Sequence, residues 1–364
     1  MSSLKKISER IKTIKSTYQV TSSMKVVAVS RLRKLHEAFL KTTPYIDEMN
    51  RMIRRLIRSA TVRQENLFWQ GSEEILPLPP LLKGNGKDER YVVVVITSDD
   101  GLSGSSNVQV VKKAQEVIKH LKQEKKQITV FGFGTKGAEI LKRLYADDEK
   151  IHIVTLKRKV ANKGETYLDA ERLSVDLLEA FNQNKFDVCL FVYNEFKSVV
   201  SQRPTIDQLI PSKMFSGENP WQFIIDTNDL DYISRDVLGQ KKYALKQSAF
   251  LKAYGGVDML SPLGALDADL LKPATRPVES YDYEGGDLTI LERVLPQYIT
   301  AYMNRILLET DVADNAARLM AMDNATRNAE DMLKMMQKVY RRTRQSKITT
   351  DITEVVSGAM AQQQ

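Results

Sequence analysis

The sequence predicts an α/β protein in which the two ends of the chain form a long antiparallel coiled coil and the middle forms a domain with a mainly parallel sheet. Apolar residues recur at helical spacing along both ends, over lengths far greater than one small domain needs. Between them, β-branched runs alternate with helical stretches. Clusters of proline and glycine separate these parts. The predicted divisions are 1–60, 61–89, 90–211, 212–285 and 286–361.

The N-terminal segment carries a heptad seam with one polar interruption. Its apolar residues step by three and four at Leu4, Ile7, Ile11, Ile14 and Tyr18. The seam falters at Thr21 and Lys25, with Met24 and Val27 beside it, and resumes from Ala28 to Phe39. We expect Pro44 to kink this helix and Thr43 to leave helical geometry, because a residue before proline disfavours the α region. A second apolar run follows from Ile46 to Ile57.

The C-terminal segment, from Asp287 to about Met360, is the stretch around which the chain is organised. It has no proline after Pro296 and is rich in good helix formers. At about 1.5 Å per residue it would reach roughly 100 Å, so it needs a partner along its length. A ridge of small side chains, which lets a second helix approach closely, comes from Ala313, Ala317, Ala321, Ala325 and Ala329. The simplest partner is the N-terminal seam; the alternative is two ordinary helices packed on a globular core.

The middle of the chain reads as a Rossmann-like α/β domain. Strands are expected at 90–97, 127–133, 151–156 and 187–193, and helices at 108–125, 136–144 and 167–184. The run RYVVVVIT at 90–97 is typical of a buried parallel strand. Residues 61–89 are interpreted as a linker. The stretch from about Pro211 to Pro277 is irregular, with one short helix expected at 241–254.

The composition is that of a soluble globular protein. The 364 residues are 42% hydrophobic and 27% charged, without an apolar run long enough to span a membrane or to serve as a signal peptide. Cys189 lies in an apolar strand and is expected to be buried; one cysteine makes no internal disulfide. His36, His120 and His152 lie in different elements without metal-ligand spacing, so we interpret them as structural or solvated. We predict no cofactor and no metal.

Positive charge is concentrated at the N-terminus. Residues 1–63 hold fifteen Lys or Arg and four Asp or Glu, a net of +11, whereas the whole chain carries +8 and the rest therefore −3. Such a basic helix suits nucleic acid, an anionic membrane or an acidic protein partner, and the alternative is a solvated face. A concentration this high favours a partner.

Two patterns in the middle domain suggest chemistry. Gly132, Gly134 and Gly137 spell GxGxxG between a strand and a helix, which in the right setting binds a dinucleotide. Here the motif follows the second strand, and no acid stands where it would hold a ribose, so we interpret it as a tight turn. The pair Asp99–Asp100 suggests a carboxylate or metal site, but no second acidic cluster accompanies it. We find no nucleophile–base arrangement.

Taken in order, the motifs resemble the gamma subunit of F-type ATP synthase. Residues 7–35 resemble that family's opening helix, Ser98–Asn107 its TDRGLCGxxN segment, Gly134–Gly137 its GSKG turn, and 201–211 a further block. Near the C-terminus, 317–329 (ARLMAMDNATRNA) resembles ARMxAMxxATxNA, and 344–356 (RQSKITTDITEVV) resembles RQxxITxEIxEI. The resemblance leaves out about 213–278. Chloroplast-type members carry a regulatory cysteine pair near there, whereas this stretch contains no cysteine.

The resemblance implies a non-catalytic rotor shaft that couples proton flow to conformational cycling of catalytic beta subunits. Its implied partners are the alpha and beta subunits of the catalytic ring, the epsilon and delta subunits and the c-ring of the membrane sector, with no nucleic acid. Met24 and Lys25, at the polar break, would face an acidic beta loop, and Arg344 and Gln345 would meet a second beta loop near the top of the bore. The implied location is peripheral, on the cytoplasmic face of a bacterial inner membrane or, alternatively, the matrix face of the mitochondrial one.

Two other classes remain as alternatives. A basic coiled-coil protein that binds nucleic acid would show affinity that falls steeply with salt. A nucleotide-dependent enzyme would show saturable binding of a dinucleotide to the isolated chain.

Overall fold

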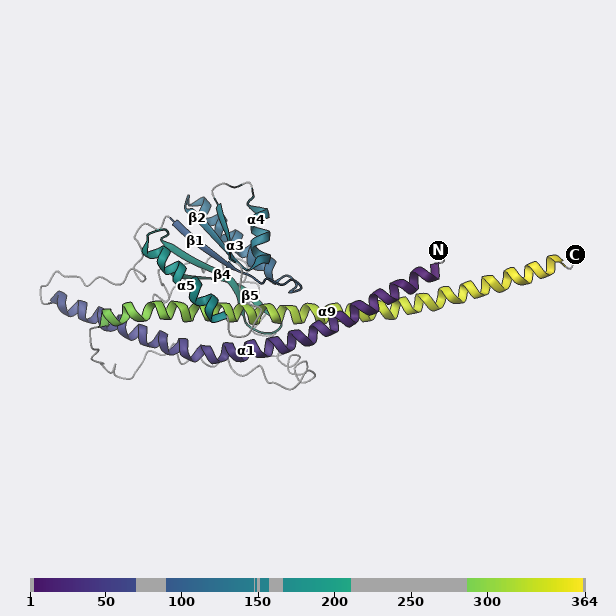
Figure 1. Cartoon of the computed structure of the whole chain (residues 1–364), viewed down its shortest axis with the longest axis horizontal. Helices are drawn as coiled ribbons and strands as arrows, with labels where there is room; N and C mark the ends of the chain where they lie inside the picture. The colour runs from purple at the N-terminus through teal and green to yellow at the C-terminus, as the bar shows by residue number, and fades with distance from the viewer. Residues whose placement is uncertain are drawn as a thin grey trace.

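The computed structural model describes residues 3–69, 90–146, 148, 151–156, 166–210 and 287–362. Helices α1 (Ser3–Trp69) and α9 (Asp287–Gln362) run side by side as a shaft, and an α/β domain lies against one flank of it (Figure 1). The predicted antiparallel pair of terminal helices and the α/β class are confirmed. The predicted irregular region at 212–285 and its short helix at 241–254 lie outside the described residues.

Helix α1 is continuous through Pro44, so the expected departure of Thr43 from helical geometry is wrong. Proline lacks the amide hydrogen that would bond to the carbonyl of Leu40, which costs about 3 kcal/mol in a helix interior. Packing of the residues before and after Pro44 outweighs that cost, because Phe39 and Ile46 are both buried. The helix is curved rather than broken (Figure 1). It also runs to Trp69, into the range predicted as a linker from residue 61.

The domain is built on a five-stranded sheet with the order β3-β2-β1-β4-β5. All neighbours are parallel except β4 and β5, which are antiparallel. The strands are β1 (Arg90–Ile96), β2 (Gln127–Phe133), β3 (Ile151–Leu156), β4 (Val188–Phe196) and β5 (Gln202–Ile210), and the helices are α3 (Ser106–Gln123), α4 (Thr135–Leu144) and α5 (Thr166–Asn182). The seven elements predicted for this domain are all present, with ends shifted by a few residues.

Strand β5 was not predicted. Pro204 lies inside it and polar residues fill its first half, which is unusual for a central strand but allowed in β5 because it is the edge strand of the sheet. Its second half is buried at Ile206, Leu209 and Ile210. Leu209 and Ile210 join the cluster with α9, whereas Ile206 joins the cluster on the other face of the sheet.

The two faces of the sheet are covered differently. Val93 and Val95 of β1 point into a cluster with α3 and α4, whereas Val92 and Val94 point into a cluster with α5 and both shaft helices. The second cluster includes residues of α1 between Ile46 and Leu56, and residues of α9 between Leu291 and Leu307. The shaft therefore completes the hydrophobic core of the α/β domain. Within the described chain, no helix is both long enough and apolar enough to cross a membrane.

Candidate functional site

The candidate functional residues lie along the shaft and at its joint with the α/β domain. A compact group of buried side chains, here called the seam cluster, fills the space between α1, α9 and the end of β4. Its members are Ala28, Leu32, Phe39, Phe196, Val199, Leu308, Val312, Ala313, Ala316 and Leu319. Small residues on α9 bring its backbone close to α1, as the alanine ridge predicted. Ala321 of the same ridge instead faces the domain, 3.7 Å from the position that a Cβ on Gly104 would take.

Lys25 fills the polar break in the heptad seam. Its Nζ lies 2.7 Å from Asp323 Oδ1 of α9, and the two side chains are 13% and 4% exposed. One turn along α1, the hydroxyl oxygens of Thr21 and Thr326 lie 3.0 Å apart. The interruption at Thr21 and Lys25 is therefore matched by polar partners on the opposite helix. Asp323 was not predicted as this partner, although a charged residue among the ridge alanines opposite a polar break was a signal for it.

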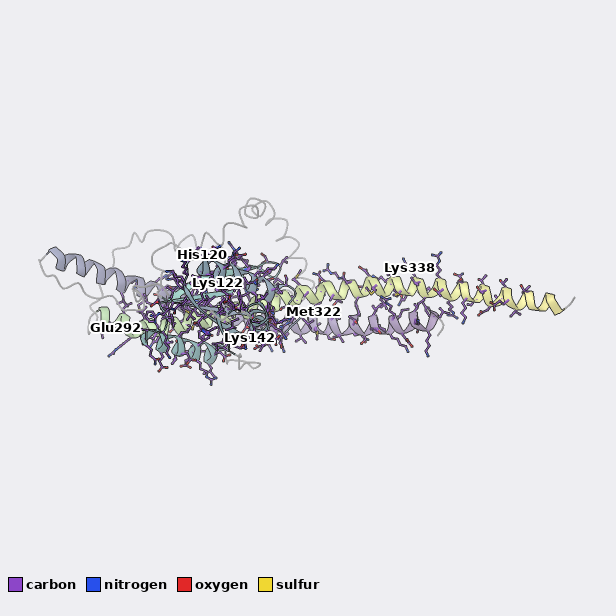
Figure 2. All side chains as sticks on the ribbon, turned by 90° about the horizontal axis from the view of Figure 1, so that it is seen from above. His120, Lys122, Lys142, Glu292, Met322 and Lys338 are labelled. Carbon is purple, nitrogen blue, oxygen red and sulfur yellow. The ribbon has the colours of Figure 1, made fainter. Side chains whose placement is uncertain are left out.

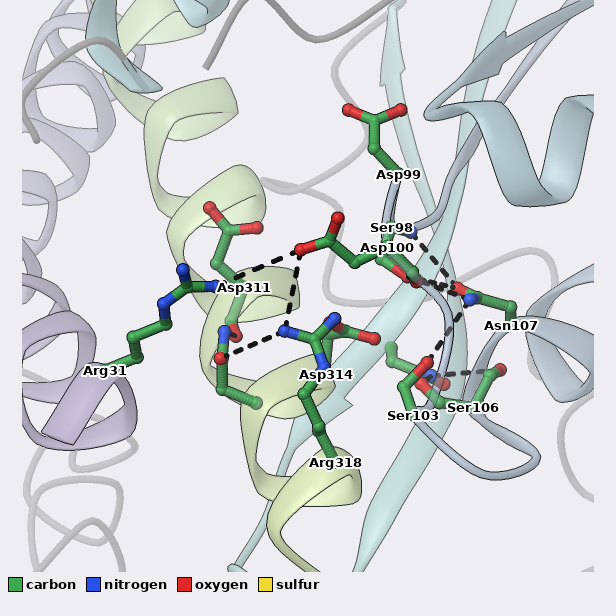
Figure 3. Close-up of polar contacts among 12 residues, drawn as sticks. Arg31, Ser98, Asp99, Asp100, Ser103, Ser106, Asn107, Asp311, Asp314 and Arg318 are labelled. Atoms are coloured by element: carbon green, nitrogen blue, oxygen red, sulfur yellow. Dashed lines mark hydrogen bonds and ion pairs between the residues drawn. The ribbon is translucent and has the colours of Figure 1, made fainter. Parts of the chain in front are cut away.

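The turn between β1 and α3 joins the domain to both shaft helices (Figure 3). Asp100 reaches out from this turn, and a carboxylate oxygen lies 3.9 Å from Arg31 of α1 and 3.9 Å from Arg318 of α9. Arg318 also pairs with Asp314, at 2.9 Å. Burial raises the pKa of Asp314, and the Arg318 guanidinium opposes that rise. Asp100 therefore connects the α/β domain to both shaft helices.

Asn107 and Asp99 hold the turn itself in place. Asn107 Nδ2 donates to Ser98 Oγ at 2.8 Å, and its Oδ1 accepts from the Ser98 amide at 3.1 Å (Figure 3). Asp99 Oδ1 accepts from the Thr135 amide at 2.7 Å, at the start of α4. The two residues of the Asp99–Asp100 pair therefore have different roles: Asp99 binds the start of α4, and Asp100 contacts the shaft helices. Within the described residues, no group of three His, Cys, Asp or Glu side chains is arranged to hold a metal.

The three glycines of GxGxxG are explained by packing between β2, α4 and the end of β1. A Cβ on Gly134 would lie 2.0 Å from the Thr97 carbonyl oxygen, and one on Gly137 would lie 2.5 Å from Thr97 Cγ2. A Cβ on Gly132 would lie 2.7 Å from that of Ala138. This geometry supports the interpretation of a tight turn between strand and helix.

The single cysteine and the three histidines have the environments that the sequence predicts. Cys189 is fully buried in β4, and burial raises the pKa of its thiol. His36 is buried with its ring 5.7 Å from that of Phe196, and burial lowers its pKa. His120 lies 3.2 Å from the Glu124 carboxylate, and His152 is exposed.

A buried polar group connects the sheet to α9. The hydroxyls of Tyr193 and Tyr302 donate to the same oxygen of Asp207, at 2.8 and 3.1 Å. Burial raises the pKa of Asp207, while these two hydrogen bonds lower it. Nearby, Glu309 Oε1 accepts from the Phe196 amide at 3.2 Å. These buried carboxylates were not found from the sequence, because they lie far apart in it.

Glu309 makes the joint sensitive to pH. Burial raises its pKa to about 7, with Arg305 opposing the rise and the carboxylates of Glu195 and Asp207 adding to it. Because the pKa of Glu309 is higher in the folded protein than in the unfolded chain, protonation of Glu309 stabilises the fold. This contribution to the free energy of unfolding is fully present below about pH 4.5 and is lost as the pH rises through about 7. Glu309→Gln keeps a neutral acceptor for Phe196. We therefore expect the free energy of unfolding of the variant, relative to that of the wild type, to increase by roughly 3 kcal/mol as the pH rises from 4.5 to 8.

The measurement is urea unfolding of the full chain at pH 5 and pH 8, comparing the variant with the wild type at each pH. Glu292→Gln, which changes an exposed carboxylate on the same helix, serves as the control and should show little change. A difference between Glu309→Gln and wild type that is the same at both pH values would contradict this assignment.

The far end of the shaft consists of the two helices alone within the described chain. Met322 lies where the shaft leaves the α/β domain, and Lys338 lies well out along the two-helix part (Figure 2). The end of α9 continues past the N-terminus of α1 (Figure 1). Its apolar side chains are exposed, including Ile348, Ile352 and Val355, and basic residues precede them at 341–347. Exposed apolar residues in such numbers indicate a surface that a partner covers.

The residues predicted to contact beta subunits differ in exposure and in the direction in which they point. Met24 is 39% exposed on the outer side of α1, and Arg344 and Gln345 are exposed on the end of α9. Lys25, by contrast, points into the seam toward Asp323. Met24 and Lys25 thus lie on α1, whereas Arg344 and Gln345 lie on α9, farther along the shaft.

The described chain is therefore a two-helix shaft with an exposed end and an α/β domain packed against its side. A family model described as ATP synthase matches residues 3–361. The chain is 34% identical to the ATP synthase gamma chain of Maricaulis maris and 32% identical to that of Paracoccus denitrificans, over 99% of this chain and 100% of each relative. The chain belongs to the ATP synthase gamma chain family.

Solved structures agree with this fold. The chain is similar to one from the OSCP, F1 and c-ring part of the Euglena gracilis mitochondrial ATP synthase, with a TM-score of 0.54 and 17% identity over 98% of this chain and 94% of that one. A second similar chain comes from the rotor of the same enzyme, with a TM-score of 0.50 and 15% identity over 95% and 98% of the two chains.

Proposed function

We propose that this chain is the central rotor shaft of an F-type ATP synthase, a non-catalytic subunit that couples proton flow through a c-ring to the catalytic beta subunits. The observation that carries the proposal is the match to gamma chains over almost the whole length, on a chain whose long helices extend as an exposed shaft. The α/β domain would form the foot, in contact with the epsilon subunit and the c-ring. The shaft would enter the bore of the ring of alpha and beta subunits, and the delta subunit would belong to the same complex.

The shaft can act without touching nucleotide. It is asymmetric, because in the described chain α9 alone forms its tip while α1 covers α9 farther down (Figure 1). Each orientation would therefore present a different surface to each beta subunit. A partner shifts a conformational equilibrium by the difference between its contact energies with the two states. Rotation would thereby change the affinity of each beta subunit in turn.

Charge supports a protein partner of opposite sign. Residues 1–63 carry a net charge of +11, and α1 holds most of it along the shaft. Acidic loops of beta subunits would complement this surface. We assign Met24, Arg344 and Gln345 to these contacts, because all three are exposed. An arginine at the tip suits bidentate contact with a carboxylate. Lys25 is paired with Asp323 of α9.

Replacing both tip residues tests this assignment. We expect Arg344→Ala with Gln345→Ala to lower coupled ATP turnover several-fold while leaving assembly intact, since these side chains touch partners and not the core. ATP synthesis by membrane vesicles gives the turnover, and subunit content gives the assembly. Gln109→Ala with Arg143→Ala, a pair of the same residue types exposed on the α/β domain, is the matched control. Unchanged turnover would remove Arg344 and Gln345 from the mechanism.

The proposal as a whole is tested by pulling down the tagged chain from its own membranes. Recovery of alpha, beta and epsilon subunits with ATPase activity is the expected result. Recovery of nucleic acid with salt-sensitive affinity would favour the alternative of a basic coiled-coil protein instead. Membrane fractionation tests the location, which we propose to be peripheral on the cytoplasmic face of a bacterial inner membrane, or alternatively on the matrix face of a mitochondrial one.

A further inference from the structure

A charged pair lies inside the seam of the shaft, just beyond the α/β domain. Lys25 Nζ and Asp323 Oδ1 are 2.7 Å apart, and both side chains are largely buried. Arg327 approaches the second oxygen of Asp323 at 2.6 Å from the exposed side. The neighbouring contact with the domain is at Ala321, beside Gly104. From this point outward, in the part of the chain that the structure describes, α1 and α9 have only each other.

The pair is better suited to fix geometry than to add stability. Moving two charges out of water costs about as much as their attraction returns, so a buried ion pair is weak evidence for a stabilising role. A polar residue at a core position of a coiled coil, however, selects one register at the expense of others. The adjacent seam residues Ala28, Ala313 and Ala316 present shallow ridges that resist sliding weakly.

A slip of one helical turn would be penalised in either direction. It would place Lys25 opposite Leu319, which is buried and apolar, or opposite Arg327, which carries the same charge. The first arrangement leaves a buried ammonium without a carboxylate, and the second brings two cations together. In the observed register the carboxylate of Asp323 meets this ammonium.

We propose that Lys25 and Asp323 are the register-setting pair of the shaft. They are positioning residues that hold α1 and α9 against axial slip when torque passes from the foot to the tip. The inference rests on the proposed rotor function for its consequence. The register itself is a property of this chain and can be measured separately.

Cysteine cross-linking in the full-length chain, within the assembled complex, measures the register. Thr21→Cys with Thr326→Cys reports the native register, because the two hydroxyl oxygens are 3.0 Å apart. A slip of one turn is reported by Thr21→Cys with Met322→Cys when residue 25 moves toward Leu319, and by Thr21→Cys with Glu330→Cys when it moves toward Arg327. Native Cys189 is fully buried and does not interfere. In Lys25→Glu we expect the native cross-link to fall at least fivefold and the slipped one to appear. The exchange Lys25→Asp with Asp323→Lys, made together with Arg327→Gln so that no second cation faces the new ammonium, should restore the native cross-link.

The second measurement is proton pumping per ATP hydrolysed by the same complexes in vesicles. We expect Lys25→Glu to keep hydrolysis within about twofold while pumping falls at least fivefold, and the exchanged pair to recover both. A structural defect alone would lower both together and would not be repaired by exchange. The control is Arg33→Glu with Glu37→Arg, which reverses an exposed ion pair on the same helix and should change neither readout.

The outcomes separate this inference from the proposed function. A native cross-link that persists in Lys25→Glu, or an exchange that restores nothing, overturns the register pair while leaving the rotor function standing. A register that slips and is restored by exchange, in a protein that assembles with no alpha or beta subunit, supports the pair and overturns the rotor function.

Discussion

Gly134→Ala is expected to destabilise the α/β domain by about 3 kcal/mol or more, because strain and a steric clash act at the same position. The residue has φ +106°, a conformation that side chains with a Cβ rarely adopt. An added Cβ would lie 2.0 Å from the carbonyl oxygen and 2.7 Å from the carbonyl carbon of Thr97. Both are backbone atoms at the end of β1, so no rotamer change relieves the overlap. Relief requires α4 to move away from the sheet.

Urea unfolding of the full chain, followed by circular dichroism, measures this loss. Gly101→Ala is the matched control, because it lies in the neighbouring turn and an added Cβ meets nothing within 4 Å. We expect Gly101→Ala to change the free energy of unfolding by less than about 1 kcal/mol. Equal stabilities of the two variants would show that the approach of β1 to α4 tolerates a side chain after all.

Leu32→Ala is expected to cost about 3 kcal/mol, within the range for truncation of a leucine in a well-packed core. Leu32 is fully buried in the seam cluster, where α1, α9 and the end of β4 meet. The cavity cannot close easily, since three elements would have to move together. We also expect limited proteolysis to cut the shaft of this variant faster, because the cluster holds the two helices to the domain.

Leu40→Ala tests whether the effect belongs to the joint or to the helix. Leu40 is on the same helix but 42% exposed, so its truncation removes the same atoms without leaving a cavity. We expect a loss below about 1 kcal/mol for this control. A comparable loss in both variants would mean that helix propensity, and not the seam cluster, determines the stability of this region.

The main architecture was predictable because its signals are local. Heptad spacing in α1 and long runs of helix formers in α9 are read within a few turns, and RYVVVVIT predicts a buried strand without knowledge of its neighbours. The continuity at Pro44 was not predictable from the local rule, since burial of Phe39 and Ile46 against distant elements outweighs it. Strand β5 was missed for a related reason: its pairing with β4 compensates for Pro204 and for its polar first half.

The joint and the register pair depended on long-range contacts. Lys25 was recognised as a break in the seam, but its partner Asp323 lies almost three hundred residues away. The same holds for Asp100, between Arg31 and Arg318, and for Asp207, which accepts from Tyr302. A local sequence pattern indicates only that a charged residue departs from its apolar surroundings. The fold decides whether its partner is another part of the chain or another protein.

The shared core also sets an order of biogenesis. One face of the sheet is covered by α5 and by both shaft helices, and α9 comes from the last part of the chain. During synthesis, the strands from β1 to β5 leave the ribosome well before α9 does. The face that α9 covers, around Phe191 and Leu209, must therefore remain open to water until α9 has been synthesised. Exposed strands of this kind invite aggregation and are typical sites of chaperone binding. The nascent chain is therefore most vulnerable in the interval before its C-terminal helix is released.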